Sequence, residues 1–211
     1  MKIRVFITDD HVLVRKGLRQ VLEECDDIEV VGEADGYAAL VAGLKQHECD
    51  VLVIDITLPG KNGIDALKQI IPERPSLRAL VISMYPEDQF ALRALKAGAS
   101  GYLTKTSGPD KLIDAVRTIA AGRKYVTPEV ASLLAENLGG ISERPPHEAL
   151  SDREFQTLRL IAAGRKPADI ARDMALSAKT VSVYRARVLE KMRMKSNAEL
   201  TRYAIERKLV D

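Results

Sequence analysis

The 211-residue sequence is short of the residues on which several protein classes depend. It has no tryptophan and only two cysteines, Cys25 and Cys49, whose spacing does not suit a metal site, so both are expected to be reduced packing residues. No apolar run approaches the roughly 18 residues of a membrane-spanning helix. The acidic pair Asp9-Asp10 lies within the N-terminal segment, where a secretory signal would need an apolar run, so a signal is not expected. We therefore expect a cytoplasmic protein.

The charge is nearly balanced overall but unevenly distributed along the chain. Lysines and arginines number 15 against 18 acidic residues in 1–121, 3 against 4 in 122–149, and 14 against 8 in 150–211. The basic excess is densest from Lys179 to Lys195, where six cations face one anion. An acidic first part and a basic last part predict different binding partners for the two ends.

Short β-rich runs alternate with helical patterns through the first 121 residues. The predicted strands are 3–7, 29–34, 51–55, 79–84 and 101–105, and the predicted helices are 12–24, 37–46, 64–71, 86–97 and 109–121. This alternation is typical of βαβ units, which place helices on both faces of a parallel sheet. We expect a doubly wound α/β domain of five strands in the order 2-1-3-4-5.

The pattern changes after Gly122. A helix is predicted over 128–137, with Thr127 as its cap and Pro128 at its first position. The segment GGISERPPHEA has no periodicity and predicts a linker, so 122–149 is expected to hold a linker helix and a flexible linker. Only helices follow. Their expected bounds are 151–164, 167–174, 178–193 and 197–207, the first opened by a capping box of Ser151 and Glu154.

Acidic residues end two of the predicted strands. The first strand ends at Asp9-Asp10 and the third ends at Asp55, and these strands are neighbours in the predicted sheet. A hard divalent cation relieves the repulsion among three carboxylates, and Mg²⁺ prefers a few carboxylates plus waters. Lys105 ends the fifth strand and reaches the same pocket. A single aspartate here is more often a helix cap, but the four charges together predict a site that accepts a phosphoryl group.

The first 121 residues resemble the receiver domain of response regulators. The matching residues are Asp9-Asp10, Asp55 in VIDITLPGKNG, Ser83 in LVISM, and Tyr102 with Lys105 in GASGYLTK. The resemblance implies that Asp55 is the phosphoacceptor and that Lys105 contacts the phosphoryl group. It also implies that Mg²⁺ is held by Asp10, Asp55 and the backbone carbonyl of Thr57, with Asp9 assisting through water.

The same resemblance implies a switch pair, Ser83 and Tyr102. The serine hydroxyl turns to bond the phosphoryl group and the tyrosine ring follows inward, which remodels the surface of the fourth helix and fifth strand. Two departures stand out. Thr106 occupies a position where many receivers have proline. Met84 and Tyr85 beside the switch serine are bulky, which suggests the hypothesis of a long-lived phosphorylated state.

The last part of the chain has the pattern of a helix-turn-helix, whose second helix enters the major groove. At 100° per residue, one side of 178–193 carries Val181, Arg185, Val188 and Met192, which are expected to face the core. Because of this placement a structural role is favoured for Arg185, such as pairing with Glu154, with DNA contact as the alternative. The residues expected to contact DNA are Lys179, Thr180, Ser182, Val183, Ala186, Arg187, Lys191 and Lys195.

Residues 150 to about 209 resemble the LuxR-type helix-turn-helix domain. The motifs are LSDREFQTLRLIAAG and IARDMALSAKTVSVYRARVLEKMRMKSNAELTRYA. With a receiver in front, the whole chain resembles a NarL/FixJ-type response regulator, and TVSVYR resembles the branch that includes the BvgA, EvgA and GacA regulators. Ser182, Tyr184 and the run Lys166-Pro167-Ala168 depart from many relatives. The binding mode is therefore expected to carry over, but the base preference is not.

These patterns predict a two-component transcription regulator and not a turnover enzyme. A sensor histidine kinase phosphorylates Asp55, which promotes dimerisation, release of the helix-turn-helix domain, or both, so that two half-sites of promoter DNA are bound. One alternative is an aspartyl-phosphate hydrolase of the dehalogenase type, but such enzymes carry an aspartate where Thr57 stands. The other is a regulator locked in one state, which the intact acidic site argues against.

Overall fold

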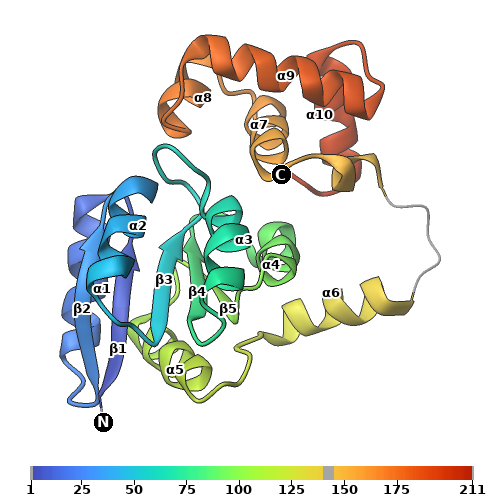
Figure 1. The fold of residues 1–211 in the computed structure, drawn as a ribbon. Coiled ribbons are helices and arrows are strands. Elements are labelled where there is room, and N and C mark those ends of the chain that lie inside the picture. The colour runs from blue at the N-terminus through green and yellow to red at the C-terminus, as the bar shows by residue number, and fades with distance from the viewer. Residues whose placement is uncertain (1, 140–144, 211) are drawn as a thin grey trace. The chain divides into compact units, whose positions relative to one another are not determined.

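The computed structural model describes residues 2–139 and 145–210, and the chain divides into two compact units, 1–140 and 141–211 (Figure 1). Among the described residues, no helix combines the length and apolarity that crossing a bilayer requires. Cys25 and Cys49 are free, half-buried thiols, and burial raises the pKa of Cys49 to about 11.

The first unit is built on a five-stranded parallel sheet. Its strands are β1 (Ile3–Thr8), β2 (Ile28–Ala34), β3 (Val51–Asp55), β4 (Arg78–Ser83) and β5 (Gly101–Thr104). They pair in parallel in the order β2-β1-β3-β4-β5, which confirms the predicted topology. The central β3 is buried at every position, as expected of an apolar run covered by helices on both faces.

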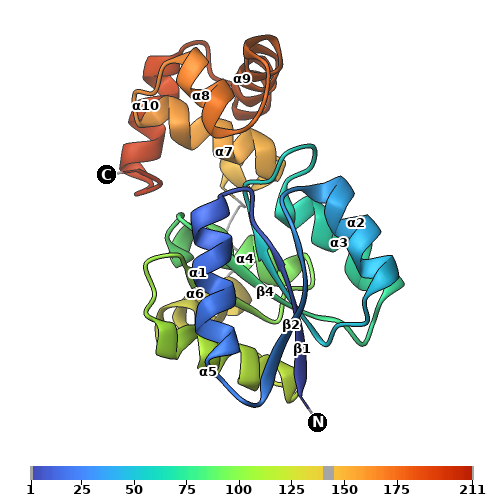
Figure 2. The same cartoon turned by 90° about the vertical axis from the view of Figure 1, so that its left-hand side faces the viewer.

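Five helices cover the two faces of this sheet. They are α1 (Val12–Glu23), α2 (Tyr37–Gln46), α3 (Gly63–Glu73), α4 (Glu87–Lys96) and α5 (Pro109–Ala120). Helices α1 and α5 lie on one face, and α2 and α3 lie on the other (Figure 2). Their ends agree with the predicted helices to within two residues. Two of the differences are at prolines: α3 continues through Pro72, and Pro86 is the N-cap of α4 instead of its first residue.

A sixth helix, α6 (Pro128–Gly139), belongs to the first unit and packs against α4. The hydroxyl of Thr127 accepts a hydrogen bond from the backbone N–H of Val130 at 3.4 Å, so the predicted cap is present. The chain enters α6 through Tyr125, which bridges to Gly101 in β5. The side chain of Val130 is buried. The predicted linker helix therefore starts firmly attached to the sheet domain.

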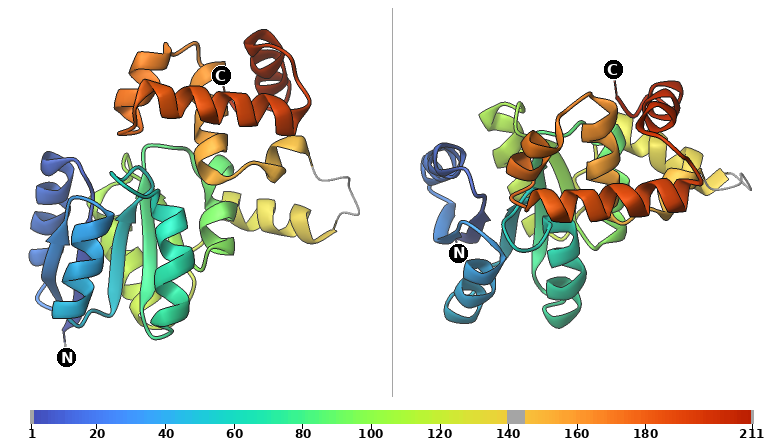
Figure 3. Two further views of the ribbon diagram at one scale, coloured as in Figure 1. Left: turned by 45° about the horizontal axis from the view of Figure 1, so that its top comes forward. Right: turned by 90° about the horizontal axis from the view of Figure 1, so that it is seen from above.

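The second unit is all-helical (Figure 3). It comprises a 3₁₀ turn, η1 (Pro146–Ala149), and the helices α7 (Asp152–Ala162), α8 (Pro167–Asp173), α9 (Ala178–Met192) and α10 (Asn197–Glu206). The capping box is confirmed, since the Ser151 hydroxyl accepts from the Glu154 N–H and the Glu154 carboxylate accepts from the Ser151 N–H at 2.8 Å.

The structure describes only part of the predicted linker. Residues 140–144 lie outside the described residues. The remaining part was expected to lack structure, but Pro146–Ala149 form the turn η1. Here Nδ1 of His147 lies 2.7 Å from the Tyr203 hydroxyl of α10, and its ring stacks on Phe155 of α7. These contacts with distant residues hold a segment that has no periodic pattern of its own.

Candidate functional site

The ends of β1, β3 and β5 bring the predicted charges together. Asp9 follows β1, Asp55 ends β3, and Lys105 follows β5. The Lys105 ammonium nitrogen lies 2.6 Å from Oδ2 of Asp9 and 2.8 Å from Oδ2 of Asp55. Asp9 and Asp55 are buried, with Asp55 only 2 % exposed. The predicted convergence of these three groups is present.

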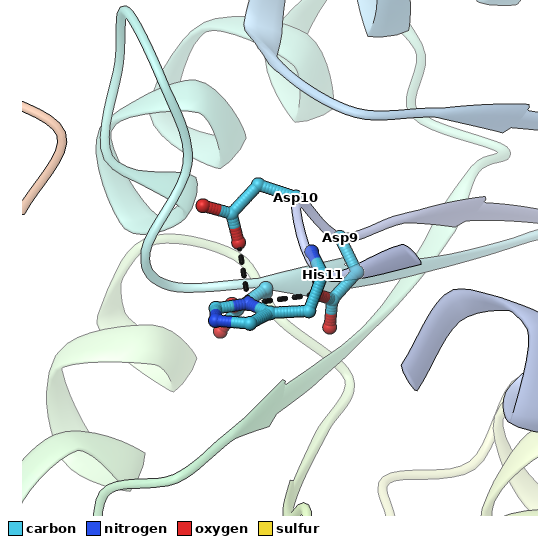
Figure 4. A group of neighbouring side chains, drawn as sticks. Asp9, Asp10 and His11 are labelled. Atoms are coloured by element: carbon cyan, nitrogen blue, oxygen red, sulfur yellow. Dashed lines mark hydrogen bonds and ion pairs between the residues drawn. The ribbon is translucent and has the colours of Figure 1, made fainter. Parts of the chain in front are cut away.

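Asp10 and His11 lie next to Asp9 and Asp55. Asp9, Asp10, His11 and Asp55 each offer a ligand atom, and all four atoms lie within 4.8 Å of one another. Nδ1 of His11 lies 2.7 Å from Oδ1 of Asp10 and 3.4 Å from Oδ1 of Asp9, so the imidazole points toward both carboxylates (Figure 4). Three carboxylates in this arrangement form an acidic pocket that fits a hard divalent cation. His11 was not predicted from the sequence, although its place directly after the acidic pair could have indicated it.

The electrostatics of the pocket oppose ionisation of Asp55. Burial raises the pKa of Asp55 to about 6; Lys105 opposes this rise, and the charge of Asp9 adds to it. The backbone N–H of Thr57 donates a hydrogen bond to the Asp55 carboxylate and favours its charged form. Burial alone lowers the pKa of Lys105, but the neighbouring carboxylates Asp55 and Asp9 raise it overall. Lys105 is therefore a protonated ammonium that contacts an aspartate whose pKa is higher than usual.

The segment after Asp55 turns sharply back on itself. Oδ1 of Asn62 accepts a hydrogen bond from the Ile64 N–H at 2.8 Å and caps α3. The Gly63 N–H donates to the Ile56 carbonyl at 2.8 Å. A Cβ atom on Gly63 would lie 2.0 Å from the Asp55 carbonyl oxygen, so only glycine fits there. This close approach holds the start of α3 against the end of β3, next to Asp55.

The predicted switch pair meets at a common residue, Tyr85. The Ser83 hydroxyl accepts a hydrogen bond from the Tyr85 N–H at 3.2 Å, and the Tyr102 hydroxyl donates to the Tyr85 carbonyl at 2.7 Å. Both Ser83 and Tyr102 are buried, and the Tyr85 ring stacks on Phe90 of α4 at 4.7 Å. Met84, by contrast, is 68 % exposed, so most of its surface is in solvent. Met84 lines the same cavity as Lys105, and the hypothesis that Met84 and Tyr85 prolong the phosphorylated state stays a prediction.

The helix α9 presents a largely exposed polar face in the second unit. The Ser177 hydroxyl caps the helix by accepting from the Thr180 N–H at 3.1 Å. The core-facing side is as predicted at Val181, Val188 and Met192, which are buried. The residues predicted to contact DNA are exposed with the exception of the half-buried Thr180: Lys179, Ser182, Val183, Ala186, Arg187, Lys191 and Lys195.

One predicted pairing in this unit is wrong. The partner of Glu154 is Lys191, whose nitrogen lies 2.6 Å from Oε2, and not Arg185. Burial disfavours the charged form of Glu154, but hydrogen bonds from Lys191 and Ser151 lower its pKa overall. Arg185 instead donates from Nε to Oδ1 of Asn197 at 2.6 Å. Helical periodicity indicated that Arg185 leans inward but could not show which neighbouring helix provides its partner.

Both units match known protein families. The family model of the response regulator receiver domain matches residues 5–117, and that of the luxR family of bacterial regulatory proteins matches 148–204. The response regulator GacA of Pseudomonas protegens is 35 % identical over 209 residues, which cover 99 % of this chain and 98 % of GacA. The chain belongs to the NarL/LuxR family of two-component response regulators. It combines a receiver with a LuxR-type DNA-binding domain, and is thus a transcription regulator and not a turnover enzyme.

Solved structures of response regulators show the same architecture. RcsB from Salmonella enterica serovar Typhimurium, bound to promoter rprA with the phosphomimetic BeF₃⁻, is similar with a TM-score of 0.63 and 28 % identity. The similarity covers 96 % of this regulator and 98 % of RcsB. A structure of two RcsB dimers on two parallel DNAs is similar with a TM-score of 0.60, 29 % identity and the same coverage.

Proposed function

We propose that this response regulator receives a phosphoryl group on Asp55 from a sensor histidine kinase in the cytoplasm. The single observation that carries the proposal is the position of the Lys105 ammonium, which lies against both Asp55 and Asp9 at the end of the sheet. In the transfer, an Asp55 carboxylate oxygen forms a bond to phosphorus as the bond from the kinase histidine nitrogen to phosphorus breaks. The histidine leaves as a neutral imidazole after taking a proton from solvent.

The acidic pocket supports Mg²⁺ as the cofactor of this step. Asp10, Asp55 and the carbonyl of Thr57 would hold the ion, with Asp9 assisting through water. When bound, Mg²⁺ neutralises charge on the phosphoryl oxygens. Lys105 supplies a fixed ammonium to the same oxygens from the protein side, so the buried carboxylates need not repel the incoming group.

Ser83 and Tyr102 would convert phosphorylation into a change of surface. Both now bond to the backbone of Tyr85, immediately before α4. The Ser83 hydroxyl, which now accepts from the Tyr85 N–H, would turn to donate to a phosphoryl oxygen on Asp55, and the turn would move its oxygen away from that N–H. Loss of that bond frees the segment before α4 and changes the contact that Tyr102 makes with it.

The output of the switch is DNA binding by α9. We propose a division into a receiver (1–121), a linker helix and linker (122–149) and a DNA-binding domain (150–211). The similarity to RcsB dimers on DNA supports binding to two half-sites as a homodimer formed on phosphorylation. Base edges would be read by Ser182, Val183 and Ala186. The phosphate contacts would come from Lys179, Thr180, Arg187 and Lys195, with Lys191 constrained by Glu154.

Intact-mass spectrometry tests the phosphoryl-accepting step. Incubation of the full-length protein with a small phosphoramidate donor and Mg²⁺ should add one phosphoryl group to the wild type and none to Asp55→Asn. Removal of Mg²⁺ with a chelator should abolish the addition. Phosphorylation of Asp55→Asn at the wild-type rate would refute the assignment of Asp55.

A further inference from the structure

Arg185 differs from the other cations of α9 in how it is held. Its Nε donates to Oδ1 of Asn197, the first residue of α10, at 2.6 Å. The residue is half-buried and the bond itself is exposed to solvent, so this bond holds the guanidinium between α9 and α10 at the surface. Within the described residues no carboxylate pairs with Arg185, and its partner Asn197 is neutral. The positive charge is therefore oriented by the protein but not compensated by it.

Arg185 and Asn197 line a cavity of about 220 Å³ that also includes Ser182 of the proposed base-reading surface. The apolar wall of this cavity includes Ile161, Ile170 and Val181. Arg165 also lines the cavity, but its Nη2 is paired with Asp173 at 2.7 Å. Arg185 is thus the cation at this cavity whose charge remains available, one turn after Ser182 on the same helix.

The geometry of the pair suits an oxyanion. Asn197 uses Nε of Arg185, which leaves the two terminal nitrogens as a planar fork of donors, and such a fork matches the oxygens of a phosphate. An arginine that is already oriented loses less side-chain entropy on binding than a free one. An arginine that served only the core would be expected to face a carboxylate, as Lys191 does with Glu154.

We propose that Arg185 contacts a DNA backbone phosphate through its terminal nitrogens and that Asn197 is a positioning residue that orients it. The proposal rests on DNA binding by α9 and adds a contact outside the face assigned from periodicity. It also gives the start of α10 a part in DNA recognition. Because phosphates carry no base identity, this contact sets affinity and register and leaves base preference to Ser182, Val183 and Ala186.

The salt dependence of DNA binding tests the proposal. Affinity of the full-length phosphorylated protein for a short duplex of random sequence is measured over a range of KCl concentrations. For Arg185→Ala we expect affinity to fall about tenfold, the effect of removing one charge-assisted hydrogen bond. The plot of log affinity against log salt should become shallower by about 0.9 for each phosphate that is no longer neutralised. Arg185→Lys should restore the slope but only part of the affinity, since a lysine has no fork.

Asn197→Ala separates positioning from contact. It leaves the charge in place, so the slope should stay at the wild-type value while affinity falls several-fold. In the Arg185→Ala background it should cause no further loss. The control is Arg172→Ala, because Arg172 lies in the same domain, is 73 % exposed and is paired with Asp169. Its slope should match the wild type.

The two variants and the wild type give distinguishable outcomes. Unchanged slope and affinity in Arg185→Ala, with a lowered melting temperature, would make Arg185 a structural residue and overturn the proposal. An equal loss from Asn197→Ala with and without Arg185 would overturn the positioning role. If the wild type shows no salt-dependent DNA binding, the proposed function fails along with the contact, whereas wild-type binding with an unaffected Arg185→Ala refutes the contact alone.

Discussion

The chemistry of Asp55 follows from its burial. The carboxyl group is 2 % exposed and its pKa is raised to about 6, mainly by loss of water. Ionisation of the buried Asp55 at neutral pH therefore lowers the stability of the folded receiver, and the ion pair with Lys105 reduces this loss. The same arrangement favours a bound dication, whose positive charge offsets the buried carboxylates.

This cost predicts a pH-dependent gain in stability for Asp55→Asn. The folded pKa of Asp55 lies above the ordinary value of 3.8, so the folded protein keeps a proton that the unfolded chain has lost between about pH 4 and pH 6. Stability of the wild type must then fall as pH rises through this window. In metal-free buffer at pH 7, the free energy of unfolding of Asp55→Asn should be higher than that of the wild type by on the order of 1–3 kcal/mol. The difference should vanish below pH 4.

Urea unfolding of both proteins at a series of pH values measures this difference. The Asp26→Asn variant serves as a control for the loss of one carboxylate, because Asp26 is exposed. Stability curves of Asp55→Asn and wild type that run parallel from pH 4 to pH 7 would contradict the burial of an ionisable Asp55.

Lys191 should contribute to stability and not to DNA affinity. Its ammonium is 2.6 Å from the buried Glu154 of the capping box, while no carboxylate in the described part of the chain pairs with the exposed ammonium of Lys195. Lys191→Ala should lower the free energy of unfolding by about 1 kcal/mol or more, because it leaves a buried charge without its partner. Thermal melts and the salt slope of DNA binding distinguish the two lysines. Lys195→Ala should change the slope only, and a changed slope without destabilisation in Lys191→Ala would reverse the assignment.

For single residues, the sequence predicts which charged side chains meet at the strand ends, but it does not predict which side chains pair between helices. Asp9, Asp55 and Lys105 could be placed together because parallel strands end at one edge of the sheet. Asn197 could not be assigned to Arg185, nor Lys191 to Glu154, because these pairs depend on how separate helices pack. Periodicity determines which side of a helix a residue occupies but not which atom of another helix it meets.

At the scale of elements, the contact between α4 and α6 connects the switch to the linker. The Thr127 hydroxyl donates a short hydrogen bond to Oε2 of Glu87 in the first turn of α4, and Val130 is buried. Glu87 lies two residues after Tyr85, where Ser83 and Tyr102 bond. A change at Tyr85 therefore has a short path to the start of α6.

Thr127→Val should loosen α6. The substitution removes both the bond to Glu87 and the cap, and loss of a cap costs about 1 kcal/mol. Hydrogen–deuterium exchange of the α6 amides should become faster, while exchange in the central strand β3 stays the same. Thr127→Ser keeps the hydroxyl and should exchange like the wild type. Unchanged exchange of α6 in Thr127→Val would show that this bond does not anchor the linker helix.

Whole elements were the most predictable feature of the chain. The five strands match to within one residue and the helices to within two, because apolar alternation and caps act locally. The exceptions depend on distant contacts. The turn η1 is held by Tyr203 and Phe155, which no local pattern of 139–149 could indicate.

At the scale of the whole molecule, charge and chemistry are divided between the units. The acidic pocket lies in the first unit, whose sequence has an acidic excess, and the exposed cations of α9 lie in the basic second unit. Charge alone predicted different partners for the two ends, and the receiver and LuxR-type domains imply a kinase and DNA. Asp55 and α9 belong to different units, so we expect phosphorylation to act through a change in assembly or in linker contacts.

The central claim is that phosphorylation of Asp55 controls DNA binding by α9. Fluorescence anisotropy on a duplex identified by sequencing DNA bound to the phosphorylated protein tests it most directly. Phosphorylated wild type should bind at least about tenfold more tightly than the unphosphorylated protein, a difference of about 1.4 kcal/mol. Asp55→Ala should bind at the weak level with or without phosphodonor. Equal affinity of Asp55→Ala and phosphorylated wild type would contradict the claim.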